Sequence, residues 1–225
     1  MAVLMAIVIS ACLPVERSPV QRHGNRVILL DPVMGLDDAW EHNRLRREDT
    51  LYEISDSELG KTLKATGQNS ASILYRLFEK PGLDCDLLEW SWYVDNPQSH
   101  SNLLQKGKDD VAASLFVIFG DPGLFLDRSV PTLKYVWSNR QHQVGDVIAG
   151  PYHKKYIRSL IMQSGGASGQ QMIRQQVNLR RDFQKVFERE APERIFGVAI
   201  FTDNDDTQQP IEAHYGRIEL VCRGV

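Results

Sequence analysis

A short acidic stretch near the C-terminal end of the chain carries the side chains best suited to chemistry. Residues 203–207 read Asp-Asn-Asp-Asp-Thr, and they lie between two apolar runs, 195–202 and 211–221. Asp, Asn and Thr side chains bond nearby backbone groups in turns, so one interpretation is a hairpin turn between two strands. The other is a ligand or cation site, because carboxylate oxygens bind hydroxyl groups and hard cations.

The spacing of the acidic stretch resembles a calcium loop only in its first half. Asp203, Asp205 and Thr207 have the alternate spacing of the first ligands of an EF-hand. Gln208 replaces the turn glycine, however, and His214 stands where the bidentate Glu belongs, so the stretch is not an EF-hand. A calcium ion held by Asp203 and Asp205 with backbone carbonyls remains one expectation, and a site without a cofactor is the other.

Two apolar runs lead to acidic residues. The runs 111–119 and 195–202 are apolar on both faces, which is typical of central strands in a sheet. Asp110 precedes the first run and Asp203 follows the second. We therefore expect the acidic loop to border Asp110 and to gather four carboxylates at one mouth.

Aromatic and polar side chains elsewhere complete a candidate binding surface for a glycan or small molecule. Aromatic faces stack on apolar sugar patches, and carboxylates and amides bond hydroxyl groups. The candidate ligand-binding residues, expected on one concave face or rim, are Tyr93, Asp95, Asp110, Trp137, Asn139, Asp203, Asp205 and Tyr215. If the protein is an enzyme, its acid and base are expected among Asp95, Asp110, Asp203 and Asp205, since two carboxylates suffice for glycoside hydrolysis.

Other catalytic motifs are absent from the sequence. Gly60-Lys61-Thr62 ends like a phosphate loop, but Ser55 stands where the earlier glycine is needed. The six histidines are scattered without a paired zinc-binding spacing, and no Gly-x-Ser-x-Gly nucleophile elbow occurs. The net charge of −3, without a basic run, argues against a nucleic-acid surface.

Short strands dominate the predicted elements. The clearest is 87–95, in which Leu88, Trp90 and Trp92 share one face, so both tryptophans are predicted to lie in the core. Further strands are predicted at 26–30, 40–45, 51–55, 61–66, 72–78, 133–138, 156–162 and 172–179, with 61–66 and 72–78 paired through the turn 67–70.

One helix is predicted, over about 178–190. It begins at the N-cap Asn178, carries Leu179, Phe183 and Val186 at helical spacing, and ends before Pro192. About ten short strands with one helix before the last hairpin predict an all-β fold, a two-sheet antiparallel jelly-roll-like sandwich. Its 225 residues, 42% of them hydrophobic, predict a single domain over 26–225.

The N-terminal residues read as a targeting segment. Residues 1–12 are apolar and too short to span a bilayer, and residues 9–12, Ile-Ser-Ala-Cys, resemble the lipobox of bacterial lipoproteins. Lipidation of Cys12 would be the only membrane link, and 13–25 would be a linker. The alternative is an N-terminal strand with a buried cysteine. An exported protein could also form a disulfide between Cys85 and Cys222.

The chain resembles a family of exported bacterial proteins of unknown function over most of residues 38–221. The resemblance rests on residues 40–42, 72–76, 88–95, 109–110, 135–139, 182–183, 197–207 and 215–216. This sequence has Asn204 and Asp206 where the family pattern has Thr and Asn, so the resemblance gives less support to a ligand role at these two positions. The resemblance implies a cell-envelope protein with a sandwich like that of carbohydrate-binding modules, and it implies no reaction.

Three function classes follow from these observations. The preferred one is a non-catalytic carbohydrate or small-ligand binding module of the cell envelope, in the periplasm or on the outer membrane as a lipoprotein. The second is a polysaccharide-active hydrolase that uses paired Asp residues, and the third is a structural envelope protein.

Overall fold

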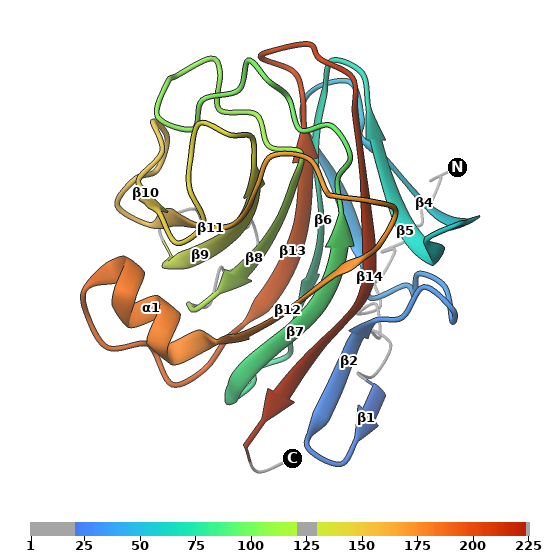
Figure 1. Ribbon diagram of the computed structural model, residues 1–225. Helices are drawn as coiled ribbons and strands as arrows, with labels where there is room; N and C mark the ends of the chain where they lie inside the picture. Colours follow the sequence, from blue (N-terminus) through green and yellow to red (C-terminus); the bar gives the residue numbers. More distant parts are fainter. Residues whose placement is uncertain (1–20, 121–129, 224–225) are drawn as a thin grey trace, which may run out of the picture.

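The protein is a sandwich of two β-sheets with a helix at one edge (Figure 1). The computed structural model describes residues 21–120 and 130–223. Cys12, the predicted leader 1–12 and most of the predicted linker lie outside these residues. The remainder of that linker includes β1 (Gln21–His23), which pairs with β2 (Arg26–Leu30), so the sheet begins before the predicted domain start at residue 26.

The first sheet is built around one long strand, β14 (Ile211–Cys222). One edge of β14 pairs with β7 (Cys85–Tyr93), which pairs in turn with β12 (Ile173–Asn178). The other edge pairs first with β5 (Gly60–Gly67) and then with β2 (Arg26–Leu30). Beyond β5 lies β4 (Leu51–Ser57).

The second sheet has a single linear order. It runs β10 (Val147–Ile148), β11 (Ile157–Ser164), β9 (Thr132–Ser138), β8 (Ala113–Ile118), β13 (Gly197–Asp203), β6 (Ser70–Leu77) and β3 (Glu41–Arg47). The all-β sandwich and the central places of β8 and β13 are therefore confirmed. Among the described strands, β9 and β11 depart from the antiparallel pattern and run parallel.

Two predicted hairpins do not form. β5 and β6 lie in different sheets, and so do β13 and β14, although each pair is joined by a short, turn-rich loop. Such loops suit a passage from one sheet to the other as well as a hairpin. Whether such a loop forms a hairpin or crosses between the sheets depends on longer ladders with distant strands, such as the ladder between β14 and β7.

An aromatic cluster fills the space between the sheets. Trp90 and Trp92 are 3% and 0% exposed, which confirms that both belong to the core. Their ring centroids lie 5.2 Å apart in an edge-to-face arrangement, and Trp92 also meets Trp137 at 5.6 Å. Edge-to-face pairs add stability beyond the burial of their area, so this cluster joins the two sheets.

The helix α1 (Leu179–Phe187) begins at the predicted cap. The Asn178 side chain accepts a hydrogen bond from the Arg181 backbone N–H at 2.9 Å. Leu179, Phe183 and Val186 are buried against the core, as predicted from their spacing. Glu188 takes a left-handed conformation and ends the helix slightly earlier than expected. Among the described residues, no helix has the length and apolar character needed to cross a membrane.

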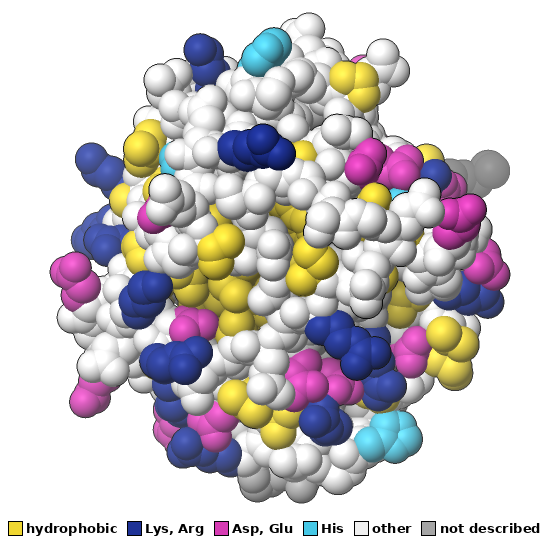
Figure 2. All heavy atoms as spheres, in the orientation of Figure 1, with side chains coloured by type: hydrophobic (Ala, Val, Ile, Leu, Met, Phe, Trp, Pro, Cys, Tyr) yellow, Lys and Arg dark blue, Asp and Glu magenta, His cyan; other side chains and the backbone are white. Residues whose placement is uncertain are grey.

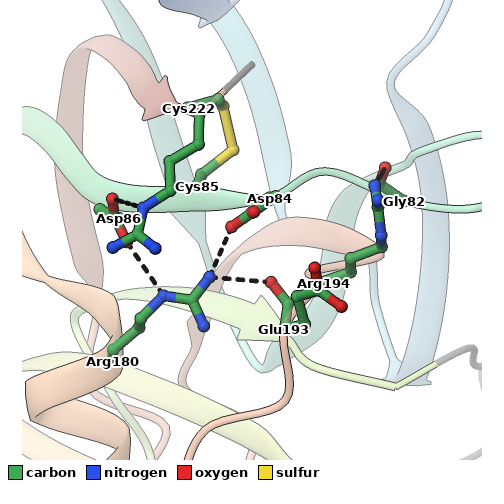
Figure 3. The surroundings of a disulfide bond; sticks show 9 residues. Gly82, Asp84, Cys85, Asp86, Arg180, Glu193, Arg194 and Cys222 are labelled. Carbon is green, nitrogen blue, oxygen red and sulfur yellow. Dashed lines mark hydrogen bonds and ion pairs between the residues drawn. A yellow bond between two sulfur atoms is a disulfide. The ribbon is translucent and has the colours of Figure 1, made fainter. Parts of the chain in front are cut away.

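A disulfide closes one end of the first sheet. Cys85 and Cys222 are opposite each other on β7 and β14, and their sulfur atoms are bonded (Figure 3). The predicted possibility of this pairing is thus confirmed. Because 137 residues separate the two cysteines, the bond removes much of the freedom of the unfolded chain.

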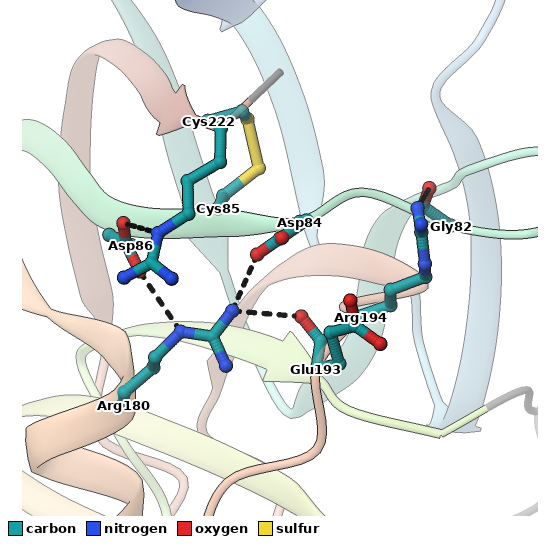
Figure 4. A network of polar contacts seen from close by, with 9 residues as sticks. Gly82, Asp84, Cys85, Asp86, Arg180, Glu193, Arg194 and Cys222 are labelled. Atoms are coloured by element: carbon teal, nitrogen blue, oxygen red, sulfur yellow. Dashed lines mark hydrogen bonds and ion pairs between the residues drawn. A yellow bond between two sulfur atoms is a disulfide. The ribbon is translucent and has the colours of Figure 1, made fainter. Parts of the chain in front are cut away.

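Beside the disulfide, Arg180 ties the helix to the first sheet (Figure 4). Its guanidinium donates to Asp84 at 2.5 Å, to Asp86 at 2.9 Å and to the backbone carbonyl of Glu193 at 3.1 Å. Arg223 donates to the second oxygen of Asp86. These contacts lower the pKa of Asp86 although its partial burial opposes them. The network fixes the place where the chain leaves the first sheet for the second.

We expect Trp92→Ala to lower the free energy of unfolding by about 3–5 kcal/mol, because it removes a buried indole and leaves a cavity between the sheets. Urea unfolding followed by circular dichroism measures the loss. Val33→Ala, at a side chain that is 69% exposed, is the control and should unfold like the parent. A Trp92→Ala protein as stable as the parent would contradict the core assignment.

Candidate functional site

A cavity of about 400 Å³ opens on the outer face of the second sheet. Its floor is made of the alternate residues of β8, β13 and β6 that point away from the core: Phe116, Ile118, Ala199, Phe201, Ala71 and Ile73. The intervening Leu115, Val117, Val198 and Ile200 face the core between the sheets. Strands that are apolar on both faces therefore build the core with one face and this floor with the other.

Loops and the edge strand β3 form the walls of the cavity. Leu45 and Arg46 of β3 line it, as does the loop with Pro151 and Tyr152 that precedes β11. The Arg46 guanidinium lies 5.8 Å from the centroid of the Tyr152 ring, within cation–π range. This contact holds the edge strand and the loop together across the cavity.

Carboxylates gather at one end of the cavity. Asp109, Asp203, Asp205 and Asp206 all line it. Asp110 lies directly behind them, and oxygen atoms of Asp110, Asp203 and Asp205 lie within 4.8 Å of one another. The expectation that the acidic loop borders Asp110 is thus confirmed.

Asp110 is 1% exposed and holds the loop rather than facing the cavity. One of its oxygens accepts a hydrogen bond from the Asp206 backbone N–H at 3.2 Å. The other accepts from the backbone N–H and the hydroxyl of Thr207, at 2.7 and 2.6 Å. Asp203 is bound in a similar way by the backbone N–H of Val111 at 2.7 Å.

Asn204 holds the acidic loop in place, a role that the sequence did not predict. Its side chain is fully buried, donates to the carbonyls of Gly67 and Gln209 at 2.9 and 2.8 Å, and accepts from the Ser70 backbone N–H at 2.9 Å. It joins the two loops that pass between the sheets. Because both its oxygen and its nitrogen bond the backbone of these loops, the Asn204 side chain has a structural role.

Lys134 is a second feature that sequence reasoning missed. Its ammonium lies 5.2 and 5.1 Å from the ring centroids of Phe116 and Phe201, at the floor of the cavity. Burial lowers the pKa of Lys134 and raises the pKa of Asp203 well above its usual range, while the attraction between the two charges opposes both shifts. The sequence feature that could have indicated this role is a single lysine among the apolar residues of β9, at a position that points away from the core.

The structure separates the predicted ligand-binding residues. Tyr93 and Asp95 lie by a different hollow of about 370 Å³, which Glu212 and His214 also line. The His214 ring is held by Thr62 at 2.9 Å and by Glu212 at 3.0 Å.

The remaining three predicted residues are buried and bind the protein itself. Trp137 donates to the Gly165 carbonyl at 2.7 Å, and the Asn139 amide donates to the Gln98 and Ser101 carbonyls at 2.7 Å each. The Tyr215 hydroxyl accepts from the Ser114 backbone N–H at 3.1 Å. Only Asp203 and Asp205 of the predicted set line the cavity, and Asp110 supports them from behind.

The face of the sandwich seen in Figure 2 carries acidic and basic side chains interspersed with each other. This distribution fits the small net charge of −3.

A family model described as "Protein of unknown function (DUF3047)" matches residues 38–219. The chain belongs to this family. The predicted resemblance to a family of unknown function is confirmed at that level. No curated protein matches the chain in sequence.

Solved structures similar to this chain include a carbohydrate-binding module and a glycoside hydrolase domain. The family 11 carbohydrate-binding module from Clostridium thermocellum, in complex with a β-1,3-1,4-mixed-linked tetrasaccharide, has a TM-score of 0.43 at 10% identity, over 88% of this chain and 95% of that one. The Endo-D glycoside hydrolase domain from Streptococcus pneumoniae R6 has the same TM-score and identity, over 83% of this chain and 22% of that one. These likenesses concern the fold alone.

We expect the melting temperature in millimolar calcium to equal that in EDTA. Lys134 already supplies positive charge to the carboxylates that would hold the ion, Asp110, Asp203 and Asp205, and backbone donors occupy several of their oxygens. Thermal unfolding followed by circular dichroism tests this. A bound ion would instead add about 2.7 kcal/mol of stability at a hundredfold excess over its dissociation constant. A calcium-dependent rise that disappears in Asp203→Asn/Asp205→Asn would contradict the expectation.

Proposed function

We propose that this protein is a non-catalytic binding module for a carbohydrate or a similar hydroxyl-rich small ligand. The observation that carries the proposal is the cavity on the second sheet, which has an apolar floor and carboxylates at one end. Its volume of about 400 Å³ lies within the usual range of small-ligand sites. A sugar ring would rest its C–H groups on the floor.

The acidic end suits hydroxyl groups in particular. An ionised carboxylate only accepts hydrogen bonds, and each of its oxygens can take more than one donor. Asp205 and Asp206 lie at this end, held in place because Asp110 and Asn204 fix the backbone on either side of them. A site with pre-positioned acceptors binds a ligand at a lower cost in entropy than a mobile loop would.

A polysaccharide hydrolase is the second candidate. Burial raises the pKa of Asp203 well above its usual range, as a general acid requires, and Asp205 lies beside it. Asp95 borders the other hollow and Asp110 is fully engaged with the loop. For this candidate we therefore propose Asp203 and Asp205 as the acid and the base.

The proposal also places the protein in the cell envelope, as a lipoprotein anchored through Cys12. The bond between Cys85 and Cys222 supports export, since disulfides persist in oxidising compartments such as the periplasm. A glycan ligand fits that location, where polysaccharides are exposed.

We expect Cys12→Ser to move the exported protein from the membrane fraction to the soluble fraction of a bacterial host, because a lipid chain on Cys12 would be its only anchor. Fractionation and immunoblotting measure the distribution. Identical fractionation of variant and parent in the soluble pool would reject the lipoprotein assignment.

We expect Ile73→Trp to weaken ligand binding at least about tenfold, or about 1.4 kcal/mol. Ile73 lies on the cavity floor, and an indole there would occupy space that the ligand needs. Isothermal titration calorimetry of the full chain against a panel of envelope and plant oligosaccharides measures binding. Ile54→Trp is the matched control, because Ile54 is 37% exposed on β4 of the other sheet.

Two outcomes would overturn this proposal. Ligand affinity that survives Ile73→Trp in a folded protein would place the site elsewhere. Release of reducing ends from the same oligosaccharides, abolished by Asp203→Asn, would make the protein a hydrolase instead.

A further inference from the structure

The cavity carries more negative than positive charge. Four carboxyl groups line it, from Asp109, Asp203, Asp205 and Asp206, against the basic side chains of Arg46 and Lys134 and the imidazole of His153. Because the floor is apolar and the site is partly enclosed, water screens this imbalance less than it would at an open surface. The cavity therefore favours a ligand that brings positive charge.

Two of the carboxylates already have basic partners. Lys134 attracts Asp203 at the floor, and the Arg46 guanidinium lies 3.9 Å from the Asp205 carboxylate. Burial is the main cause that raises the pKa of Asp109 and of Asp205, and the nearby charge of Asp206 raises both further. Lys134 also acts on Asp109, and Arg46 also acts on Asp206, so two basic side chains are shared by four carboxyl groups.

Asp109 also has an unused acceptor. Its Oδ1 atom is buried and has no hydrogen-bond partner among the described residues. Burial is the main cause that raises the pKa of this carboxyl, and the neighbouring Lys134 opposes the rise. A buried acceptor without a donor costs free energy, so a ligand that brings a charged N–H group to Asp109 gains more than one that meets a solvated carboxylate.

The protein itself shows that this end of the cavity accommodates an ammonium group. Lys134 holds its own amine within cation–π distance of Phe116 and Phe201 and in the field of Asp203 and Asp109. Rings and carboxylates together suit a primary amine. Lys134 offsets only part of the negative charge, and a second ammonium could offset the rest.

We propose that the cavity is specific for an amino sugar, with the sugar ring on the apolar floor and its ammonium group at Asp109 and Asp206. This inference rests on the proposed function, because it names the class of carbohydrate that the same cavity takes. A neutral sugar would leave the excess charge unpaired, and an acidic sugar would be repelled by it.

The test compares three oligosaccharides of equal length and β-1,4 linkage, made of glucosamine, N-acetylglucosamine and glucose. Binding to the full chain is measured by isothermal titration calorimetry at neutral pH with EDTA present, so that no metal ion competes. We expect the glucosamine form to bind at least about tenfold more tightly than the other two, the effect of a charge-assisted hydrogen bond. Spermine tests whether charge alone is sufficient, and it should bind more weakly than the glucosamine form.

Asp109→Asn and Asp206→Asn should each reduce the preference for the amine while leaving the melting temperature within a few degrees of the parent. Asp56→Asn, at an exposed position on β4, makes the same change of charge away from the cavity and should keep the preference. Both cavity variants retain their size, so a loss of preference would report charge rather than shape.

The outcomes separate this inference from the proposed function. If the glucose or N-acetylglucosamine form binds at least as tightly as the amine, the inference is overturned and the binding module stands. If spermine binds as tightly as the amino sugar, or if the cavity variants keep the preference, the assignment of an amino sugar at Asp109 and Asp206 is overturned. If no oligosaccharide of this set or of the wider panel binds, the proposed function fails as well.

Discussion

The buried amide of Asn204 is the constraint on which the rest of the site depends. The loops 67–70 and 204–210 both connect a strand of one sheet to a strand of the other. A loop that crosses between the sheets buries backbone N–H and C=O groups that no neighbouring strand can pair. Such groups must be satisfied in another way. The Asn204 amide bonds backbone groups of Gly67, Ser70 and Gln209, and an added Cβ at Gly67 would lie only 3.1 Å from the Asn204 side-chain oxygen.

Once these loops are fixed, the positions of the carboxylates follow. Asp203 ends β13 immediately before Asn204, and Asp205 follows it, so neither can move without breaking the amide contacts. Asp110 holds the next two residues of the loop from behind. A buried ionic network is costly unless its members are paired, and here Lys134 and the backbone donors provide the pairing.

The sequence predicted those features that depend on local periodicity. Alternation placed Trp90 and Trp92 in the core, and Asn178 marked the start of the helix. Prediction from the sequence failed where the strands that pair are distant in the chain. The short loops that suggested hairpins connect strands of different sheets. The position of β14 follows instead from its ladder with β7. The sequence did predict that the acidic loop with Asp203 borders Asp110. It could not show that Tyr93 lies by the other hollow or that Trp137 is buried in the core. Nor could it show that Lys134 lies near Asp203.

The place of β14 has a consequence for how the chain is synthesised. β14 is the last of the described strands, yet it pairs with β2, β5 and β7, which leave the ribosome long before it. The first sheet therefore cannot close until β14 has been translated, and the edges of β2, β5 and β7 that face β14 stay unpaired until then. Folds with such distant pairings form slowly.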